Sequence, residues 1–530
     1  MPSRLSPLPW PEIFVYWLLS LGSHFYSFYQ LHKFSKEHEA GLQREFQLEN
    51  GLFKGFKRDP SDFEWSFWTE WAKKSLLWTL VGHGVLSRLA AIFHPKLKVL
   101  ALTVFDFLAA SSLLGFKGVG VLLLQLSVAF SVAQLRKPSL TWIANLLLLS
   151  TIHIQPLQHI QRGWYSTEEE YYLLLFSIAV CGLRFISFSL EHCWSPLECG
   201  RVAQLFWLFS YTFYHPFFYN GPIITFKAYS EQMRKSVDEN SGQESVFGYV
   251  LVRSARVILW WILAEYMIHV MYMHSIHSNE TYVEMLPPWA LELEVISAPC
   301  LLSAPGGLAL ALVQFFYVKY LVLFGLPSML ATLDGLVPPK LPRCVSIMHS
   351  FTGMWRYFDE GLYRWLIRYI YVPLGGSRHG PLSKVFSTSV AFAFVCFWHG
   401  GQDYLRYWAL MNWAGVLVEN AIRSLFGSSR LHAVVVSFLI KALNSSRAAA
   451  TDQISPLILQ GRKSLATQVV LLHLIKQAVD RLCKSADSRQ THWASSNWHD
   501  ITVSRLHPIN GNFFARFLWE SARPQNSPKL

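Results

Sequence analysis

His399 is the residue whose type and surroundings most clearly suggest chemistry. It lies in Phe397-Trp398-His399-Gly400-Gly401, at the end of an apolar run that has no charged residue after Lys384. A neutral imidazole can accept a proton near physiological pH, and low-dielectric surroundings favour the neutral form. The two glycines allow a backbone or a substrate to approach closely. Residue type alone leaves a catalytic and a structural histidine evenly balanced.

Asp359 is a second candidate, at the end of the aromatic stretch 351–359. If this stretch is helical, Trp355, Asp359 and Tyr363 share one face. In a functional interpretation, Asp359 orients a substrate amine or the histidine. The alternative is an ion pair of Arg356 with Asp359 or Glu360 on an interfacial helix.

Several other ionisable residues fall within apolar runs, where charge is costly and indicates a functional or bundle-interior position. They are Asp106, Glu265, His269 and Lys319. Glu265 and His269 are four residues apart, which favours a buried hydrogen-bonded pair over a metal site. Asp106 and Lys319 could pair across the bundle, or the lysine could extend toward the interface.

The elements that carry these residues are predicted to be membrane-spanning helices. The chain is 52% hydrophobic and 15% charged, whereas soluble domains have about 25% charged residues. Apolar runs near the length needed to cross a bilayer recur along it. The sequence therefore predicts an all-α, polytopic membrane protein with spans near 10–29, 76–93, 99–114, 119–135, 140–154, 171–190, 246–273, 308–329, 385–399 and 404–426.

One apolar segment, 204–226, is interrupted by His215-Pro216 and by Asn220-Gly221-Pro222. Broken helices survive at membrane depth only where they are buried in protein or line a cavity. The segment is therefore predicted to be re-entrant or to form a cavity wall.

The net charge of +12 does not indicate nucleic-acid binding, because no nucleic-acid motif accompanies it. It fits the cytoplasmic Lys/Arg excess of membrane proteins, with contact to anionic lipid or to a phosphate-bearing cosubstrate. The seven cysteines form no CxxC pair, which argues against a disulfide framework or a structural zinc site.

The chain changes character near Gly427, which predicts a transmembrane domain over 1–426 and a separate tail over 427–530. Within the tail, Leu465, Val469 and Leu472 begin the apolar stripe of an amphipathic surface helix. The polar residues 484–530 are expected to be disordered.

Six sequence strings carry a resemblance to a known family. They are 17–35, Asp62-Phe63-Glu64-Trp65-Ser66-Phe67-Trp68, Glu170-Tyr171-Tyr172-Leu173-Leu174, Tyr317-Val318-Lys319-Tyr320-Leu321-Val322-Leu323-Phe324-Gly325, 350–359 and Trp398-His399-Gly400-Gly401. Over residues 10–426 the chain resembles the membrane-bound O-acyltransferase (MBOAT) superfamily, and within it the Hedgehog acyltransferases.

The resemblance implies a helical bundle with broken helices around a central acyl tunnel. It implies palmitoyl transfer from palmitoyl-CoA to the α-amine of the N-terminal cysteine of Hedgehog proteins. His399 would be the general base and Asp359 its partner acid. Trp355 and Arg356 would line the acyl-CoA path, and Asn220 is expected to contact substrate. Relatives without the histidine are inactive, so its presence here favours the catalytic branch.

The resemblance also implies haem b, with Cys344 in Leu-Pro-Arg-Cys-Val as its axial ligand. The expected location is the endoplasmic reticulum membrane, with the Golgi membrane as an alternative. The expected partners are Hedgehog precursors, palmitoyl-CoA and membrane lipids. Cationic residues must meet the CoA phosphates, and the candidates are Lys227, Arg234, Arg253 and Arg256.

The tail departs from the family, which continues there with two hydrophobic spans. Two alternatives follow. The chain could be a catalytically impaired scaffold or binder, or it could use another lipid or protein acceptor.

Overall fold

The computed structural model describes residues 9–238, 243–286, 307–348 and 350–427. The predicted tail over 427–530, with its amphipathic helix, lies outside the described residues apart from Gly427. The α-helices are α1 (Trp10–Glu37), α2 (Glu39–Phe46), α3 (Phe63–Trp71), α4 (Leu77–Phe93), α5 (Lys98–Ala133), α6 (Pro138–Ser150), α7 (Gln155–Arg162), α8 (Glu168–Trp194), α9 (Arg201–Phe213), α10 (Phe226–Asp238), α11 (Gln243–Val270), α12 (Met273–Ser278), α13 (Glu280–Met285), α15 (Gly307–Leu323), α16 (Gly325–Leu333), α17 (Phe351–Tyr357), α18 (Glu360–Leu366), α19 (Pro381–Trp398) and α20 (Asp403–Gly427).

Short elements complete the described chain. The strands β1 (Glu49–Asn50) and β2 (Lys57–Arg58) form a two-residue antiparallel hairpin. Single turns of 3-10 or π-helix join several helices: η1 (Ala72–Leu76), η2 (Pro95–Leu97), η3 (Thr151–His153), η4 (His215–Phe217), η5 (Val345–Ile347) and η6 (Ile367–Tyr371).

Five helical segments of the described chain are long and apolar enough to cross a membrane, which confirms the prediction of a polytopic helical protein. They are Phe63–Phe93, Pro95–Ala133, Glu168–Trp194, Gly307–Leu333 and Pro381–Trp398. A sixth is obtained if Pro138–His153 and Gln155–Arg162, bent by 63°, count as one broken span. The predicted spans on α1, α11 and α20 are helical but are not among these segments. Polar residues such as Arg253, Asn412 and Glu419 interrupt two of them.

The spans predicted over 99–114 and 119–135 lie on the two sides of a kink within α5, so the predicted separation is present as a break in helical geometry. The kink lies at Gly115, where φ is +68°. A left-handed φ strains other residues, and glycine adopts it readily. Gly115, the first residue of the Gly-Phe-Lys-Gly sequence, therefore interrupts the regular helix between the two predicted spans.

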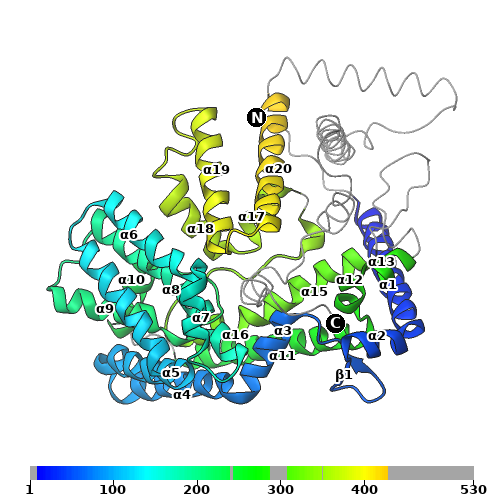
Figure 1. The fold of residues 1–530 in the computed structure, drawn as a ribbon, viewed down its shortest axis with the longest axis horizontal. Coiled ribbons are helices and arrows are strands. Elements are labelled where there is room, and N and C mark those ends of the chain that lie inside the picture. Colours follow the sequence, from blue (N-terminus) through cyan, green and yellow to red (C-terminus); the bar gives the residue numbers. More distant parts are fainter. Residues whose placement is uncertain (1–8, 239–242, 287–306, 349, 428–530) are drawn as a thin grey trace.

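Helix α8 is the central element of the larger hydrophobic core, and 94% of its most apolar 18-residue stretch is buried. Its N-terminus is well defined, because Thr167 and Glu170 form a reciprocal capping box and three glutamates occupy the first turn. Helices α5, α6, α7, α9 and α10 pack around it (Figure 1). A helix that is apolar on all sides is buried on all sides, so the surrounding helices pack directly against α8.

A second, smaller core joins α1, α11, α12 and α15, which lie together at the right of Figure 1. Its centre includes Leu31, Ile268, Ile276 and Phe315, each at most 1% exposed. The first half of α1 exposes Trp10, Phe14 and other large apolar side chains, as is typical of a surface facing lipid.

The predicted break in segment 204–226 is present. Helix α9 ends at Phe213, and η4 follows it. The buried guanidinium of Arg184 on α8 donates to the carbonyl oxygens of Tyr211 and Thr212, both at 2.7 Å, and to that of Phe217. One cation therefore satisfies the carbonyls that the helix end leaves without partners.

Candidate active site

A cavity of about 250 Å³ lies among the helices and brings together residues that are far apart in sequence. One water molecule takes roughly 30 Å³ in the liquid, so the cavity can hold a ligand of many atoms. Its walls come from α3, α8, α15, α17, α18, α19 and α20, and from the broken segment. His399, Asp359, Trp355 and Asn220 all line it, and most of the remaining wall is apolar or aromatic.

His399 follows the last residue of α19, at a helix end that the two glycines shape. Gly400 and Gly401 adopt φ values of +112° and +65°. The amide of Gly401 donates to the Cys396 carbonyl at 2.8 Å. The neighbouring Trp398 donates its indole N–H to the Ala179 carbonyl on α8 at 3.1 Å. The imidazole is therefore fixed to the central helix through its neighbour.

Asp359 is the N-cap of α18, and its carboxylate accepts the Leu362 N–H at 2.9 Å. The helix expected to run through Trp355, Asp359 and Tyr363 is broken between α17 and α18. All three side chains still line the cavity. The site residues on α17 and α18 lie outside the five candidate spans. Burial raises the pKa of the Asp359 carboxyl to about 6.

Arg356 is exposed and does not line the cavity. Its guanidinium lies 5.7 Å from the centre of the Tyr363 ring. Neither of the alternative ion pairs expected for Arg356 is present among the described contacts, since Glu360 pairs with Arg364 at 2.5 Å instead. The break before α18 removes the helical spacing on which those pairs depended.

Trp355 is held by α20. Its indole N–H donates to Asn412 Oδ1 at 3.3 Å, and its ring packs on Trp408 at 5.3 Å between centroids. Glu419 of α20 accepts hydrogen bonds from the backbone N–H and the hydroxyl of Thr352, at 2.9 and 3.1 Å. Helix α20 therefore orders α17 and also contributes to the cavity wall.

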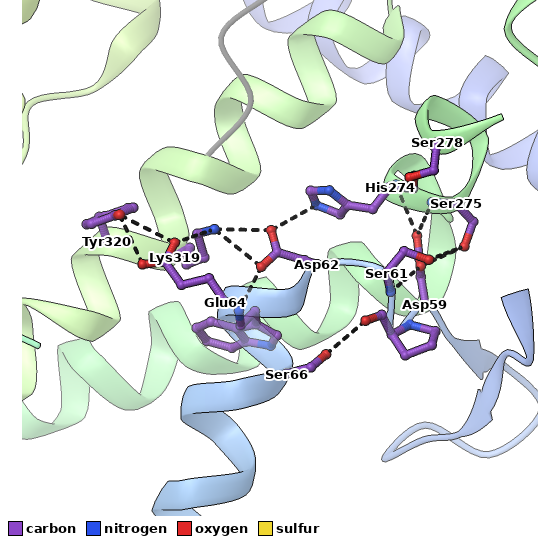
Figure 2. Close-up of polar contacts among 12 residues, drawn as sticks. Asp59, Ser61, Asp62, Glu64, Ser66, His274, Ser275, Ser278, Lys319 and Tyr320 are labelled. Atoms are coloured by element: carbon purple, nitrogen blue, oxygen red, sulfur yellow. Dashed lines mark hydrogen bonds and ion pairs between the residues drawn. The ribbon is translucent and has the colours of Figure 1, made fainter. Parts of the chain in front are cut away.

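Glu64 and Tyr320 also line the cavity, and sequence reasoning missed both. Figure 2 shows Lys319 between Asp62 and Glu64, with the Tyr320 hydroxyl on Glu64. The ammonium of Lys319 lies 2.9 Å from Glu64 and 3.1 Å from Asp62 and is 0% exposed. The string Asp62-Phe63-Glu64 could have predicted this ion pair, because two carboxylates at the start of an apolar span require a cation if they are buried.

The expected pair of Asp106 with Lys319 is therefore wrong, and the lysine does not extend to the interface. Asp106 instead contacts His83 Nδ1 at 2.6 Å, and His83 Nε2 lies 2.9 Å from Asp334. Asp334 also accepts the Tyr214 hydroxyl at 2.5 Å. This buried cluster fixes the segment that leads to Asn220.

Glu265 and His269 are both buried, but their side chains do not form the expected hydrogen bond to each other. His269 Nδ1 lies 3.8 Å from the Glu265 carboxylate and bonds to the Glu265 backbone carbonyl at 2.5 Å. Glu265 accepts the Trp65 indole N–H at 2.9 Å, and His269 Nε2 accepts the Leu52 N–H at 3.0 Å. Within the described ranges, no group of three His, Cys, Asp or Glu side chains is placed to hold a metal ion.

Cys344 is a half-buried free thiol directly before η5. A thiolate can serve as a haem axial ligand. The exposed Arg343 beside it, 3.8 Å from the Tyr357 ring centre, is placed to meet an acidic substituent. Cys344 does not line the cavity, whereas its neighbour Val345 does. The free thiol of Cys344 therefore suits a haem ligand, and it lies outside the cavity lining.

The four cations expected to meet CoA phosphates lie on α10 and α11, and none lines the cavity. Lys227 lies 3.9 Å from Glu231, and Arg234 stacks 5.0 Å from the Trp207 ring centre.

A helical membrane bundle enclosing an apolar cavity with a histidine and a carboxylate defines a membrane-embedded enzyme for a lipidic substrate. The pattern of the MBOAT, membrane-bound O-acyltransferase family, matches residues 130–441. The chain belongs to this family.

Curated relatives extend the similarity to most of the chain. It is 47% identical to the mouse (Mus musculus) protein-cysteine N-palmitoyltransferase HHAT, over 79% of this chain and 82% of that protein. It is 28% identical to the Drosophila melanogaster protein-cysteine N-palmitoyltransferase Rasp, over 62% of each chain. It is 26% identical to the mouse protein-cysteine N-palmitoyltransferase HHAT-like protein, over 79% of each.

Proposed function

We propose that this protein is a protein-cysteine N-palmitoyltransferase. It transfers a palmitoyl group from palmitoyl-CoA to the α-amine of the N-terminal cysteine of Hedgehog proteins. The observation that supports this most directly is the apolar cavity in which His399 and Asp359 lie together. The 47% identity to a named N-palmitoyltransferase supports the same reaction and acceptor.

The charges of the cavity suit an amine acceptor. Glu64 and Asp359 line it, and no lysine or arginine of the described chain does. Glu64 is already paired with Lys319 at 2.9 Å, which leaves the carboxylate of Asp359 to bind a charge. An α-amine has a pKa of about 8 and arrives mostly as the ammonium. Carboxylates hold an ammonium well, whereas a hydroxyl acceptor gives them no charge to bind. The site therefore favours amide formation over transfer to a lipid hydroxyl.

His399 is proposed as the general base. Ammonium is not nucleophilic, so a proton must leave before the nitrogen attacks the thioester carbon. The ammonium therefore first loses one proton to solvent. As the neutral nitrogen attacks, the imidazole takes a second proton from it and passes that proton to the departing CoA thiolate, so the products are the amide and CoA-SH. Asp359 orients the amine, and Trp355, Asn220 and the aromatic wall hold the acyl chain. Arg356, exposed beside the cavity residues, would contact the CoA portion together with the cations on α10 and α11.

The proposed location is the endoplasmic reticulum membrane, with palmitoyl-CoA entering from the cytosol and the acceptor from the lumen. Haem b bound at Cys344 would be structural in this scheme, with the thiolate as its ligand, and no step of the transfer passes through it.

The test is an assay of purified full-length protein with palmitoyl-CoA and a peptide that begins with cysteine. We expect a product that resists hydroxylamine, as an amide does and a thioester does not, and none when the α-amine is acetylated. His399→Ala should lower kcat by about 10²- to 10⁴-fold. His379→Ala, at an exposed histidine, should have no effect.

Two outcomes would favour the alternatives. Equal activity of the parent and His399→Ala would remove the base role. Binding of both substrates by a parent protein that makes no product would leave the scaffold interpretation.

A further inference from the structure

Two buried hydrogen-bond donors line the cavity with no protein partner among the described residues. They are the indole N–H of Trp68 and the hydroxyl of Tyr219. Their residues are 4% and 3% exposed. Leaving such a donor unpaired destabilises a folded protein, and each case in a native structure requires a reason. A ligand in the cavity that accepts both hydrogen bonds would supply that reason.

The other donors of the cavity with known partners are already used within the protein. The indole N–H of Trp355 goes to Asn412, that of Trp398 to Ala179, and the Tyr320 hydroxyl to Glu64. Trp68 and Tyr219 differ from these three, because each lines the cavity and has a buried donor without a partner among the described residues.

Both side chains are held in place by aromatic packing. The Trp68 ring contacts Phe67 and Phe176, with centroids 4.9 and 5.3 Å apart. The Tyr219 ring contacts Phe218 at 4.7 Å and His215 at 5.7 Å. Donors that are fixed before the substrate arrives cost no reorganisation when charge develops on it.

The two residues are linked through the fold to the proposed catalytic pair. Trp68 packs on Phe176 of α8. Ala179 follows Phe176 by less than one helical turn, and its carbonyl accepts the indole N–H of Trp398, the residue before His399. Tyr219 precedes Ile223 by four residues, and the backbone of Ile223 lies against Gly361, two residues after Asp359. Helix α8 therefore connects Trp68 to His399, and the contact of Ile223 with Gly361 connects Tyr219 to Asp359.

We propose that Trp68 Nε1–H and Tyr219 Oη–H form the oxyanion hole for the acyl thioester. This rests on the proposed function. When the neutral amine nitrogen bonds to the thioester carbon, the carbonyl π-electron pair moves onto oxygen, where the two donors stabilise the negative charge. The pair then re-forms the carbonyl and expels the CoA thiolate. The proton taken from nitrogen by His399 passes to that sulfur, so the products are the amide and CoA-SH.

The test uses the purified full-length protein, palmitoyl-CoA and the cysteine-led peptide. Tyr219→Phe and Trp68→Phe each remove one donor. We expect each to lower kcat by about 100-fold with little change in the KM of either substrate. Tyr171→Phe is the matched control, because its hydroxyl is also buried and unpaired within the described chain but does not line the cavity. Its kcat should equal that of the parent.

Thermal unfolding separates this role from a structural one. Tyr219→Phe should unfold at the same or a higher temperature than the parent, because it removes an unpaired donor. Slower catalysis without lost stability supports the oxyanion role. A kcat within twofold of the parent for both variants, or a loss of kcat explained by a lowered unfolding temperature, would overturn it. A parent that makes no amide overturns the proposed function and this inference with it.

Discussion

At the scale of single residues, the cavity combines groups that would be costly in lipid with partners that stabilise them. Lys319 is held between two carboxylates, and Arg184 caps three backbone carbonyls. His399 and Asp359 differ from these buried ions, because both face a space large enough for substrate. A polar side chain at membrane depth therefore has a structural or a chemical role according to what it faces.

Asp359 gives a testable pH dependence. Its pKa is raised to about 6 by burial, so the carboxylate becomes protonated as the pH falls through that value. If the ionised form orients the amine, kcat/KM should fall on the acid side of about pH 6. Asp359→Asn should be slower at all pH values and should lack this acid limb. Steady-state rates from about pH 5 to 8 measure both effects. An acid limb that persists in the variant would assign the titration to another group.

Lys319 gives a stability prediction. Lys319→Met leaves Asp62 and Glu64 buried without their shared cation and should destabilise the fold by about 3–5 kcal/mol. Adding Asp62→Asn and Glu64→Gln removes both stranded charges and should restore most of that loss. Thermal unfolding in detergent compares the two proteins. A triple variant no more stable than Lys319→Met would contradict the ion-pair explanation.

At the scale of elements, the site depends on the close approach of two segments that interrupt helices. Asp359 lies at the break before α18, and the broken segment passes directly against the same helix. A Cβ on Gly361 would lie 2.5 Å from the carbonyl oxygen of Ile223 and 2.8 Å from its nitrogen. Only glycine permits this contact, which places Asn220 and Asp359 on one cavity.

Gly361→Ala should therefore separate these segments. We expect kcat to fall at least about tenfold, since small displacements from the reacting geometry are costly, together with a lower unfolding temperature. Gly120→Ala on α5 is the matched control, because no atom lies within 4 Å of the added methyl group. Activity and thermal unfolding of the two variants should differ clearly. Equal activities would show that the backbone can shift without affecting the site.

At the scale of the whole molecule, the cavity draws its described lining residues from distant parts of the chain. Its lining residues run from Glu64 to Asn412, and α20 supplies Trp408 and Asn412. The tail that departs from the family contributes none of the lining residues described. The geometry therefore argues that catalytic competence depends on α20.

Two truncations test this. A protein ending after Gly427 keeps every described lining residue and should retain most activity per folded molecule. A protein ending before Asp403 loses α20 and should be inactive even where it remains folded. The rate of amide formation is divided by the amount of palmitoyl-CoA bound, so that a loss of activity is distinguished from a loss of folded protein. Loss of activity in the longer truncation would instead support a functional role for residues 428–530.

Much of the architecture was predictable, because span length and apolar composition are local properties. The helical class, the break after Phe213 and the candidates His399, Asp359, Trp355 and Asn220 were all reached from the sequence. The expected role of Arg356 on the acyl-CoA path stays a prediction; its side chain is exposed and does not line the cavity. The predicted domain boundary at 426/427 and the catalytic roles stay predictions. Glu64, Tyr320, Trp68 and Tyr219 were missed as site residues, because each occurs in a sequence pattern that also fits ordinary core or interface positions.

The sequence by itself determined that the chain lies in a membrane as a helical bundle, because apolar runs of that length have no other stable environment. It also indicated two of the breaks, after Phe213 and at Gly115, since Pro and Gly act on their own backbone, but not the break before α18. Only the tertiary structure decided which buried charges pair: Lys319 with Asp62 and Glu64, and Asp106 with His83. Pairing and cavity lining depend on how helices distant in sequence pack. That packing is set by the shapes of whole faces, which no single run of residues specifies.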